Sequence, residues 1–135
     1  MYKRQLTFSG NTSYEVKNLF ATIGNEVKHF VYAGHTDVVP PGNINEWKTK
    51  PFVPEVKDNI LYGRGASDMK SSISAMISAA QKFVRDNPDH KGSIGFLLTS
   101  DEEGPAKYGT QKVIEKFKKD YIEIDYCVVG EPTSS

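Results

Sequence analysis

Four short segments of this sequence contain side chains of the types that bind divalent metal ions. Each segment comes just after an apolar run or after the loop that follows one. The segments are Gly34–Asp37, Gly65–Asp68, Ser100–Glu103 and Gly130–Glu131. Because the carboxyl ends of parallel strands line one crevice of an open α/β sheet, such segments converge there. One histidine with several carboxylates suits zinc, cobalt or manganese. The sequence therefore predicts a metal centre at the rim of a sheet.

His35 and Asp37 form one candidate pair. Residues two apart in a strand point to the same side, so Asp37 is placed to accept a hydrogen bond from one imidazole nitrogen while the other nitrogen binds metal. The alternative is a loop histidine capped by a nearby carboxylate, which is common on protein surfaces.

Asp68 stands where a helix is predicted to begin, a position at which a carboxylate is ordinarily a cap. The preceding glycines, Gly63 and Gly65, exceed what a cap needs and indicate a close backbone approach. They do not indicate nucleotide binding, because the segment lacks the third glycine and the lysine of phosphate loops. Glu131, between a glycine and a proline, is either a ligand or part of a turn.

Asp101, Glu102 and Glu103 place three negative charges at the end of a predicted strand, which costs repulsion unless a cation or solvent offsets it. One interpretation is a solvated acidic turn. In the other, one glutamate binds metal and its neighbour accepts a proton from a water. A glycosidase carboxylate pair is a further possibility, but it leaves His35 and Asp68 without a role.

Alternating strands and helices are predicted to position these segments. Apolar runs predict strands at residues 16–23, 27–33, 94–98 and 124–129. Gly24 and Asn25 predict a tight hairpin turn between the first two. Apolar residues three and four apart predict one helix from after Asp68 to Asn87 and another at about 108–119. Their predicted inward residues are Ile73, Met76, Ile77, Ala80, Phe83 and Val84, and Val113, Ile114 and Phe117. The predicted fold is α/β, with a mixed, largely parallel sheet and flanking helices.

Composition limits the classes of protein open to the chain. Its 135 residues suffice for one domain with a core. Basic and acidic residues number 17 each and no basic run is long, so we expect no nucleic-acid or membrane partner. The single cysteine, Cys127, is expected to be a buried small hydrophobe. Without a leader or a membrane-length apolar stretch, the expected location is the cytoplasm.

Four motifs, taken in order, resemble those of the dinuclear zinc amidohydrolases. They are Gly34–Pro40, Leu61–Lys70, Thr99–Gly104 and Val129–Thr133. The resemblance runs from about residue 5 to the last residue. It implies a partial three-layer zinc-aminopeptidase-like domain in which Asp68 bridges two ions, zinc or cobalt. His35 and Glu131 would complete one metal site, and Glu103 would belong to the other.

The resemblance also implies an activity, the metal-dependent hydrolysis of an amide bond in an acyl amino acid. Glu102 would be the general base and acid, Asp37 would orient His35, and the Asp68–Met69 peptide bond would be cis. Similarity of the neighbouring residues favours N-succinyl-LL-2,6-diaminopimelate as the small-molecule substrate, on the route to lysine and peptidoglycan. Acetylornithine or other acyl amino acids are the alternative substrates.

Members of this family are longer than 135 residues, and they form homodimers through a lid domain. The resemblance implies that this domain and a returning segment with a second histidine ligand lie beyond Ser135. We therefore expect residues 1–135 to be the N-terminal part of the catalytic domain, to hold at most one ion well and to be inactive alone. A non-catalytic metal-binding fragment is the alternative class of function.

Overall fold

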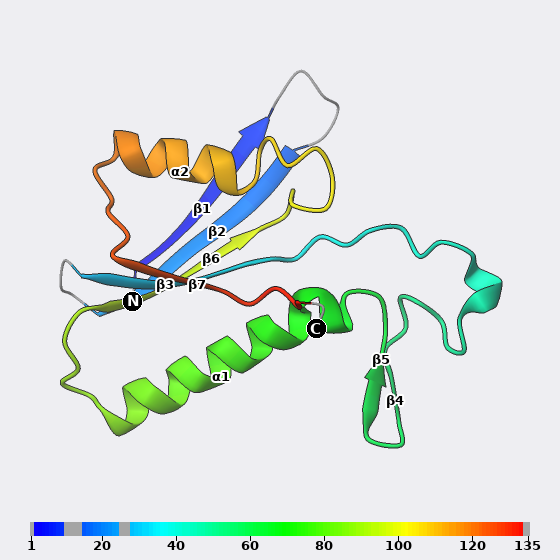
Figure 1. The fold of residues 1–135 in the computed structure, drawn as a ribbon. Helices are drawn as coiled ribbons and strands as arrows, with labels where there is room; N and C mark the ends of the chain where they lie inside the picture. The colour runs from blue at the N-terminus through cyan, green and yellow to red at the C-terminus, as the bar shows by residue number, and fades with distance from the viewer. Residues whose placement is uncertain (1, 10–14, 25–27, 134–135) are drawn as a thin grey trace.

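A five-stranded mixed sheet forms the centre of the protein in a computed structural model, which describes residues 2–9, 15–24 and 28–133 (Figure 1). In spatial order its strands are β1 (Tyr2–Ser9), β2 (Glu15–Ile23), β6 (Ser93–Thr99), β3 (His29–His35) and β7 (Tyr126–Val129). β3 runs parallel to β6 and β7, whereas β2 is antiparallel to β1 and β6. The predicted α/β fold with a mixed sheet is confirmed, and the three strands that lead into the candidate site are the parallel ones.

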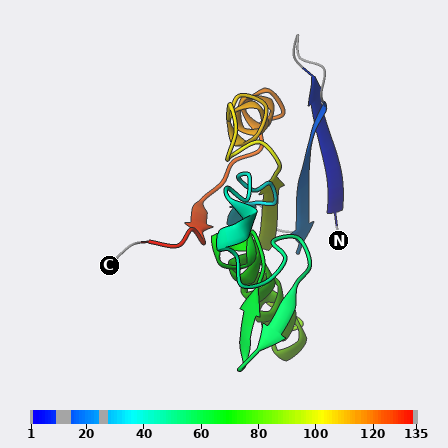
Figure 2. The same cartoon turned by 90° about the vertical axis from the view of Figure 1, so that its right-hand side faces the viewer.

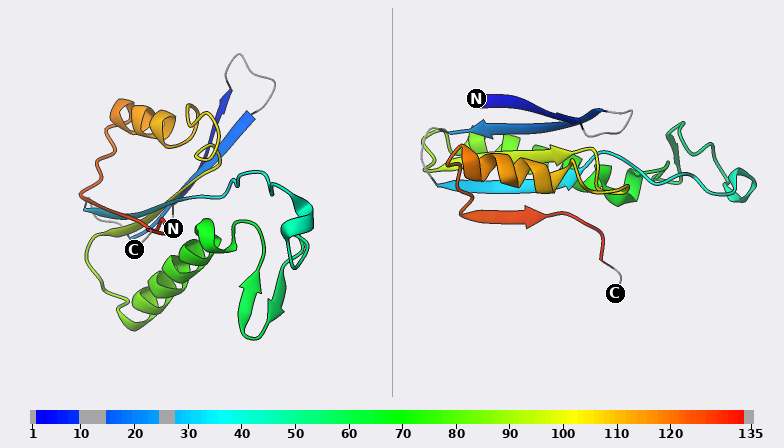
Figure 3. Two further views of the ribbon diagram at one scale, coloured as in Figure 1. Left: turned by 45° about the vertical axis from the view of Figure 1, so that its right-hand side comes forward. Right: turned by 90° about the horizontal axis from the view of Figure 1, so that it is seen from above.

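Two helices cover opposite faces of this sheet, as the left-hand view of Figure 3 shows. They are α1 (Ser71–Asp86) and α2 (Thr110–Lys119). The remaining elements are a 3₁₀ turn at Ile44–Glu46, a hairpin of β4 (Glu55–Lys57) and β5 (Ile60–Tyr62), and a tight turn at Ala66–Lys70. The order β3, α1, β6, α2, β7 with parallel strands matches the predicted crossovers.

The two helices begin and end close to their predicted limits. The N–H of Asn87 closes α1 by donating to the Phe83 carbonyl, and Pro88 follows. Ile73, Met76 and Ala80 are buried as predicted. Ile77 and Phe83 are exposed, so this part of the prediction is wrong. The sheet covers a narrower stripe of α1 than the apolar pattern suggested.

The predicted hairpin between the first two apolar runs is also wrong. β2 and β3 are not neighbours, because β6 lies between them and pairs with both. Strand β1, which the sequence did not reveal, pairs with the other side of β2. Gly24 has the positive φ expected of a turn, while residues 25–27 lie outside the described residues. The pairing of β2 with β6 joins segments about 75 residues apart, a separation that no local turn signal encodes.

β7 forms one edge of the described sheet, opposite β1 (Figure 2). All four of its residues are exposed. Cys127 is therefore exposed and not buried as expected, because a strand at the edge lacks cover that a central strand receives. None of the described helices is both long enough and apolar enough to cross a bilayer.

The main core lies between the sheet and α2. Its buried members are Leu6, Phe20, Val31, Leu97, Val113 and Phe117. The rings of Phe20 and Phe117 lie 4.6 Å apart at their centroids and tilt by 58°. This packing fixes β2, β6 and β3 against α2, so it holds the strand ends that carry the candidate site.

Replacing Phe117 by Ala is expected to lower the free energy of unfolding by about 3–5 kcal/mol, because a fully buried ring leaves a cavity. Urea denaturation measures the change. Phe83→Ala is the control, since Phe83 is 45% exposed on α1 and its loss is expected to cost less than about 1.5 kcal/mol. Equal losses for the two variants would contradict the assignment of α2 to the core.

Candidate metal centre

The predicted ligand side chains converge at the carboxyl ends of the parallel strands. His35 ends β3, Glu131 follows β7, and Glu102 and Glu103 follow β6. Asp68 comes from the turn before α1. One candidate ligand atom from each of His35, Asp68 and Glu131 lies within 4.8 Å of the other two, and the same is true of His35, Glu102 and Glu103. The two groups share His35.

His35 is buried and presents one nitrogen to each of two different environments. Its Nδ1 lies 3.0 Å from the Asp37 carbonyl oxygen, which can only accept, so Nδ1 carries the hydrogen. Its Nε2 lies 3.0 Å from Asp68 Oδ1 and 3.2 Å from Glu131 Oε1. In the neutral ring the Nε2 lone pair then points at two carboxylate oxygens. This arrangement is unfavourable unless a proton or a metal ion lies between them.

The pKa values of His35 and Glu131 reflect the same crowding of charge. Burial lowers the pKa of His35, but the Asp37 carbonyl and the nearby carboxylates outweigh it, so that pKa is raised overall. Partial burial raises the pKa of Glu131; His35 lowers it, and repulsion by the other carboxylates adds to the net rise. A bound cation would favour the carboxylate form of Glu131 and would occupy the place of the His35 proton.

Asp37 differs from its predicted arrangement. Its carbonyl, and not its carboxylate, is the hydrogen-bond partner of His35, since Asp37 Oδ1 lies 3.6 Å from Nδ1. Its Oδ2 instead accepts the backbone N–H groups of Glu102 and Glu103, each at 2.9 Å. One residue thus holds the imidazole through its backbone and the acidic turn through its side chain.

Asp37→Ala is expected to speed hydrogen exchange at the Glu102 and Glu103 amides by at least about 10-fold, because both lose a charged acceptor. Exchange followed by NMR measures this. Asp125→Ala is the matched control, since Asp125 Oδ2 accepts the His29 N–H at 2.7 Å at the amino end of β3. Unchanged exchange at both glutamates in Asp37→Ala would show that the turn holds its shape without this side chain.

The turn that carries Asp68 depends on Gly65, as the sequence suggested. Gly65 has a φ of 81°, and a Cβ there would lie 2.5 Å from Val38 Cγ1. A Cβ at Gly63 would meet its nearest atom only at 3.7 Å, so the predicted close approach applies to Gly65 alone. Asp68 and Met69 leave the helical region, and the peptide bond between them is cis, as the resemblance implied.

Two residues of the site region make contacts that the sequence analysis did not predict. Lys70 Nζ donates to the Thr36 carbonyl at 2.8 Å and so ties the loop after β3 to the Asp68 turn. Asp101 is the buried member of the acidic triplet, and its Oδ2 accepts a hydrogen bond from the Tyr108 N–H at 2.8 Å. Asp101 is thus not a solvated charge like Glu102. The residue type gave no sign of this difference, because it depends on how the loop before α2 folds back.

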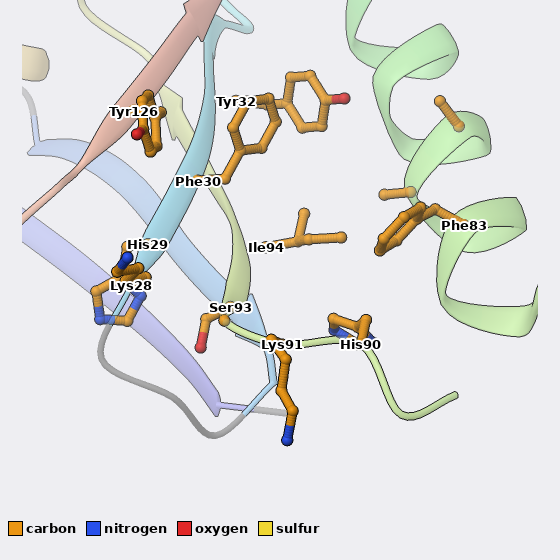
Figure 4. Close-up of a pocket in the computed structure, with 13 residues that line it drawn as sticks. Lys28, His29, Phe30, Tyr32, Phe83, His90, Lys91, Ser93, Ile94 and Tyr126 are labelled. Atoms are coloured by element: carbon orange, nitrogen blue, oxygen red, sulfur yellow. The ribbon is translucent and has the colours of Figure 1, made fainter. Parts of the chain in front are cut away.

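A separate cavity of about 500 Å³ lies at the amino ends of β3 and β6 (Figure 4). Its aromatic lining includes Phe30, Tyr32, Phe83 and Tyr126. His29 and His90, which the sequence analysis did not assign to the site, line this cavity. No carboxylate is among its described lining residues, whereas both groups of candidate ligands found among the described residues include His35 at the carboxyl end of β3.

Comparison with known proteins finds similarity over most of the chain. The sequence model described as peptidase family M20/M25/M40 matches residues 31–135. A protein of Coxiella burnetii named succinyl-diaminopimelate desuccinylase is 53% identical over 121 residues. A protein of the same name from Methylobacillus flagellatus is 58% identical over 121 residues. Each match covers 90% of this chain but 32% of the relative, so the chain spans about a third of the length of these relatives.

Solved structures resemble the fold as well. Human carnosine dipeptidase 1 aligns with a TM-score of 0.78 and 26% identity, over 98% of this chain and 30% of that protein. An M20 family metallo-carboxypeptidase from Sulfolobus solfataricus aligns with a TM-score of 0.71 and 28% identity, over 84% of this chain and 26% of that protein.

Proposed function

Because the chain belongs to peptidase family M20/M25/M40, we propose that His35, Asp68 and Glu131 hold a divalent metal ion in a site that serves amide hydrolysis. The observation that carries the proposal is the His35 ring. Its Nδ1 donates a hydrogen bond to the Asp37 carbonyl, and its Nε2 lies 3.0 Å from Asp68 Oδ1 and 3.2 Å from Glu131 Oε1. A nitrogen lone pair with two carboxylates matches the donor set of a zinc or cobalt site.

A second ion would have Asp68 and Glu103 as its protein ligands among the residues of this chain. Asp68 would then bridge the two ions. Zinc sites normally use three or four protein ligands, so this chain alone would hold the second ion less firmly. When bound, such ions supply Lewis acidity toward a carbonyl oxygen and lower the pKa of a water.

Glu102 is proposed as the general base and acid. Its side chain is exposed, one of its carboxylate oxygens lies within 4.8 Å of a His35 ring nitrogen, and its backbone N–H donates to Asp37. From there the carboxylate can accept a proton from the attacking water and return it to the departing amine nitrogen. Asp37 positions both participants, since it holds His35 through its carbonyl and Glu102 through its carboxylate.

The proposed reaction is hydrolysis of N-succinyl-LL-2,6-diaminopimelate to succinate and LL-2,6-diaminopimelate. Two relatives named desuccinylases, at 53% and 58% identity, support this choice over acetylornithine and other acyl amino acids. We also propose that the protein forms a homodimer through a further domain. We propose the cytoplasm as its location, where a free thiol such as that of Cys127 is ordinary.

A chimera tests the proposed chemistry. Grafting this chain in place of the matching third of the Methylobacillus flagellatus relative is expected to keep desuccinylase activity, with kcat/KM higher for N-succinyl-LL-2,6-diaminopimelate than for acetylornithine. Glu102→Gln in the chimera is expected to lower kcat by about 10²–10⁴-fold, the usual contribution of a general base. A folded, metal-loaded chimera without activity would favour a non-catalytic metal-binding role.

A further inference from the structure

Met69 lies beneath the candidate metal centre, fully buried. It directly follows Asp68 in the chain, and its side chain contacts the segments that carry the other two ligands. The Gly34 side of this contact is close, because a Cβ at Gly34 would lie 2.8 Å from Met69 Cε and 3.1 Å from Sδ. On the other side, a Cβ at Gly130 would lie 3.4 Å from Met69 Cε and closer still to Met76 Cε, so both methionines line that glycine. Each of the two glycines immediately precedes a proposed ligand.

The sulfur of Met69 also makes a polar contact. The backbone N–H of His35 donates to Met69 Sδ at 3.2 Å, in a buried setting. The next N–H along the chain, that of Thr36, donates to the Thr99 carbonyl of β6. Since successive N–H groups of a strand point to opposite sides, the His35 N–H points toward the β7 side. The pairing of β3 with β7 ends at Ala33 and Val129, so Met69 supplies an acceptor where the ladder has stopped.

We propose that Met69 is a positioning residue, which holds His35, Asp68 and Glu131 at the distances that a shared metal ion requires. Its backbone carries the Asp68 turn, its sulfur accepts from the backbone N–H of His35, and its methyl group packs closely on Gly34 and, beside Met76, near Gly130. The proposal rests on the metal site proposed above. A methionine that only filled the core would act through volume, whereas this role also requires the sulfur as an acceptor.

Met69→Leu separates the two roles, because leucine conserves most of the volume and lacks an acceptor. The matched control is Met76→Leu. Met76 is also buried and faces Gly130 from α1, but the His35 N–H donates to the sulfur of Met69 and not to that of Met76. Three quantities are measured on the 135-residue chain. They are the hydrogen exchange of the His35 amide without metal, the affinity for cobalt(II), and the visible absorption spectrum of bound cobalt(II).

Met69→Leu is expected to speed His35 exchange by about 10-fold. It is also expected to weaken cobalt binding by about 10- to 100-fold, the usual effect of losing a residue that supports a ligand, and to alter the cobalt spectrum. Met76→Leu is expected to change the His35 exchange rate and the cobalt affinity by less than about 3-fold each. The proposal is overturned if Met69→Leu keeps the wild-type His35 exchange rate or the wild-type cobalt affinity. It is also overturned if Met76→Leu has effects equal to those of Met69→Leu, or if Met69→Leu unfolds the whole chain while Met76→Leu does not. If the wild-type chain binds no cobalt, the metal function fails, and His35 exchange still decides the role of Met69.

Discussion

The 135-residue chain, supplied with zinc or cobalt, is expected to release succinate from N-succinyl-LL-2,6-diaminopimelate at least about 10³-fold more slowly than the longer desuccinylases it resembles. The proposed base is present, but its surroundings are open. Asp68 and Glu131 are 49% and 38% exposed. Water at such a site screens the electrostatic interactions that stabilise a developing oxyanion. In the proposed centre a second ion would have Asp68 and Glu103 as its protein ligands from this chain, so that ion would be held less firmly.

Succinate release is measured with purified chain, added metal and substrate, beside one of the longer relatives. Glu102→Ala in the same chain is the control, because it removes the proposed base and leaves His35, Asp68 and Glu131 in place. Turnover near that of the relatives would contradict the expectation of an inactive chain. If that turnover disappeared in Glu102→Ala, it would still support the role proposed for Glu102.

Zinc titration of the same chain is expected to show one tightly held ion, and His35→Ala is expected to weaken its binding by more than about 100-fold. Loss of a residue that only supports a ligand typically costs about 10- to 100-fold in affinity, and His35 is proposed as a ligand itself. It is also the residue shared by both groups of candidate ligands. Its removal therefore leaves only carboxylates, which hold zinc less well than a mixed nitrogen and oxygen set.

Calorimetry gives the affinity, and elemental analysis after dialysis gives the number of ions retained. His90→Ala is the matched control, since His90 lines the cavity at the amino ends of the strands, far along the sheet from the candidate site. Two tightly held ions per chain would contradict the expected weak second site. Unchanged zinc affinity in His35→Ala would overturn the ligand assignment itself.

The convergence of the candidate ligands could be predicted from the sequence because it depends on local patterns and one general rule. Apolar periodicity located β3, α1, β6, α2 and β7 in order. Each candidate ligand follows a strand or precedes a helix, and parallel strands bring their carboxyl ends to one edge. His35, Asp68 and Glu131 met at that edge for this reason. The cis bond after Asp68 came from the resemblance of the motif, and not from any physical pattern in the sequence.

The neighbours of each element were decided only by the tertiary structure, because they depend on contacts between distant segments. The insertion of β6 between β2 and β3 replaced the expected hairpin, and β1 joined the sheet without a clear local signal. The exposure of Cys127 followed from the place of β7 at the edge of the sheet. Alternation within a strand cannot show which strands lie on either side of it.

The division of labour within the candidate site was likewise decided by the tertiary structure. The His-x-Asp spacing suggested that the Asp37 carboxylate binds the imidazole, yet that carboxylate holds the turn of Glu102 and Glu103, 65 residues away. The sulfur of Met69 accepts from His35 across 34 residues of sequence. The sequence by itself determined which side chains are available for the chemistry and at which edge of the sheet they gather. The three-dimensional packing decided which of them bind one another, because a hydrogen bond depends on the distance and direction between atoms that only the folded chain brings together.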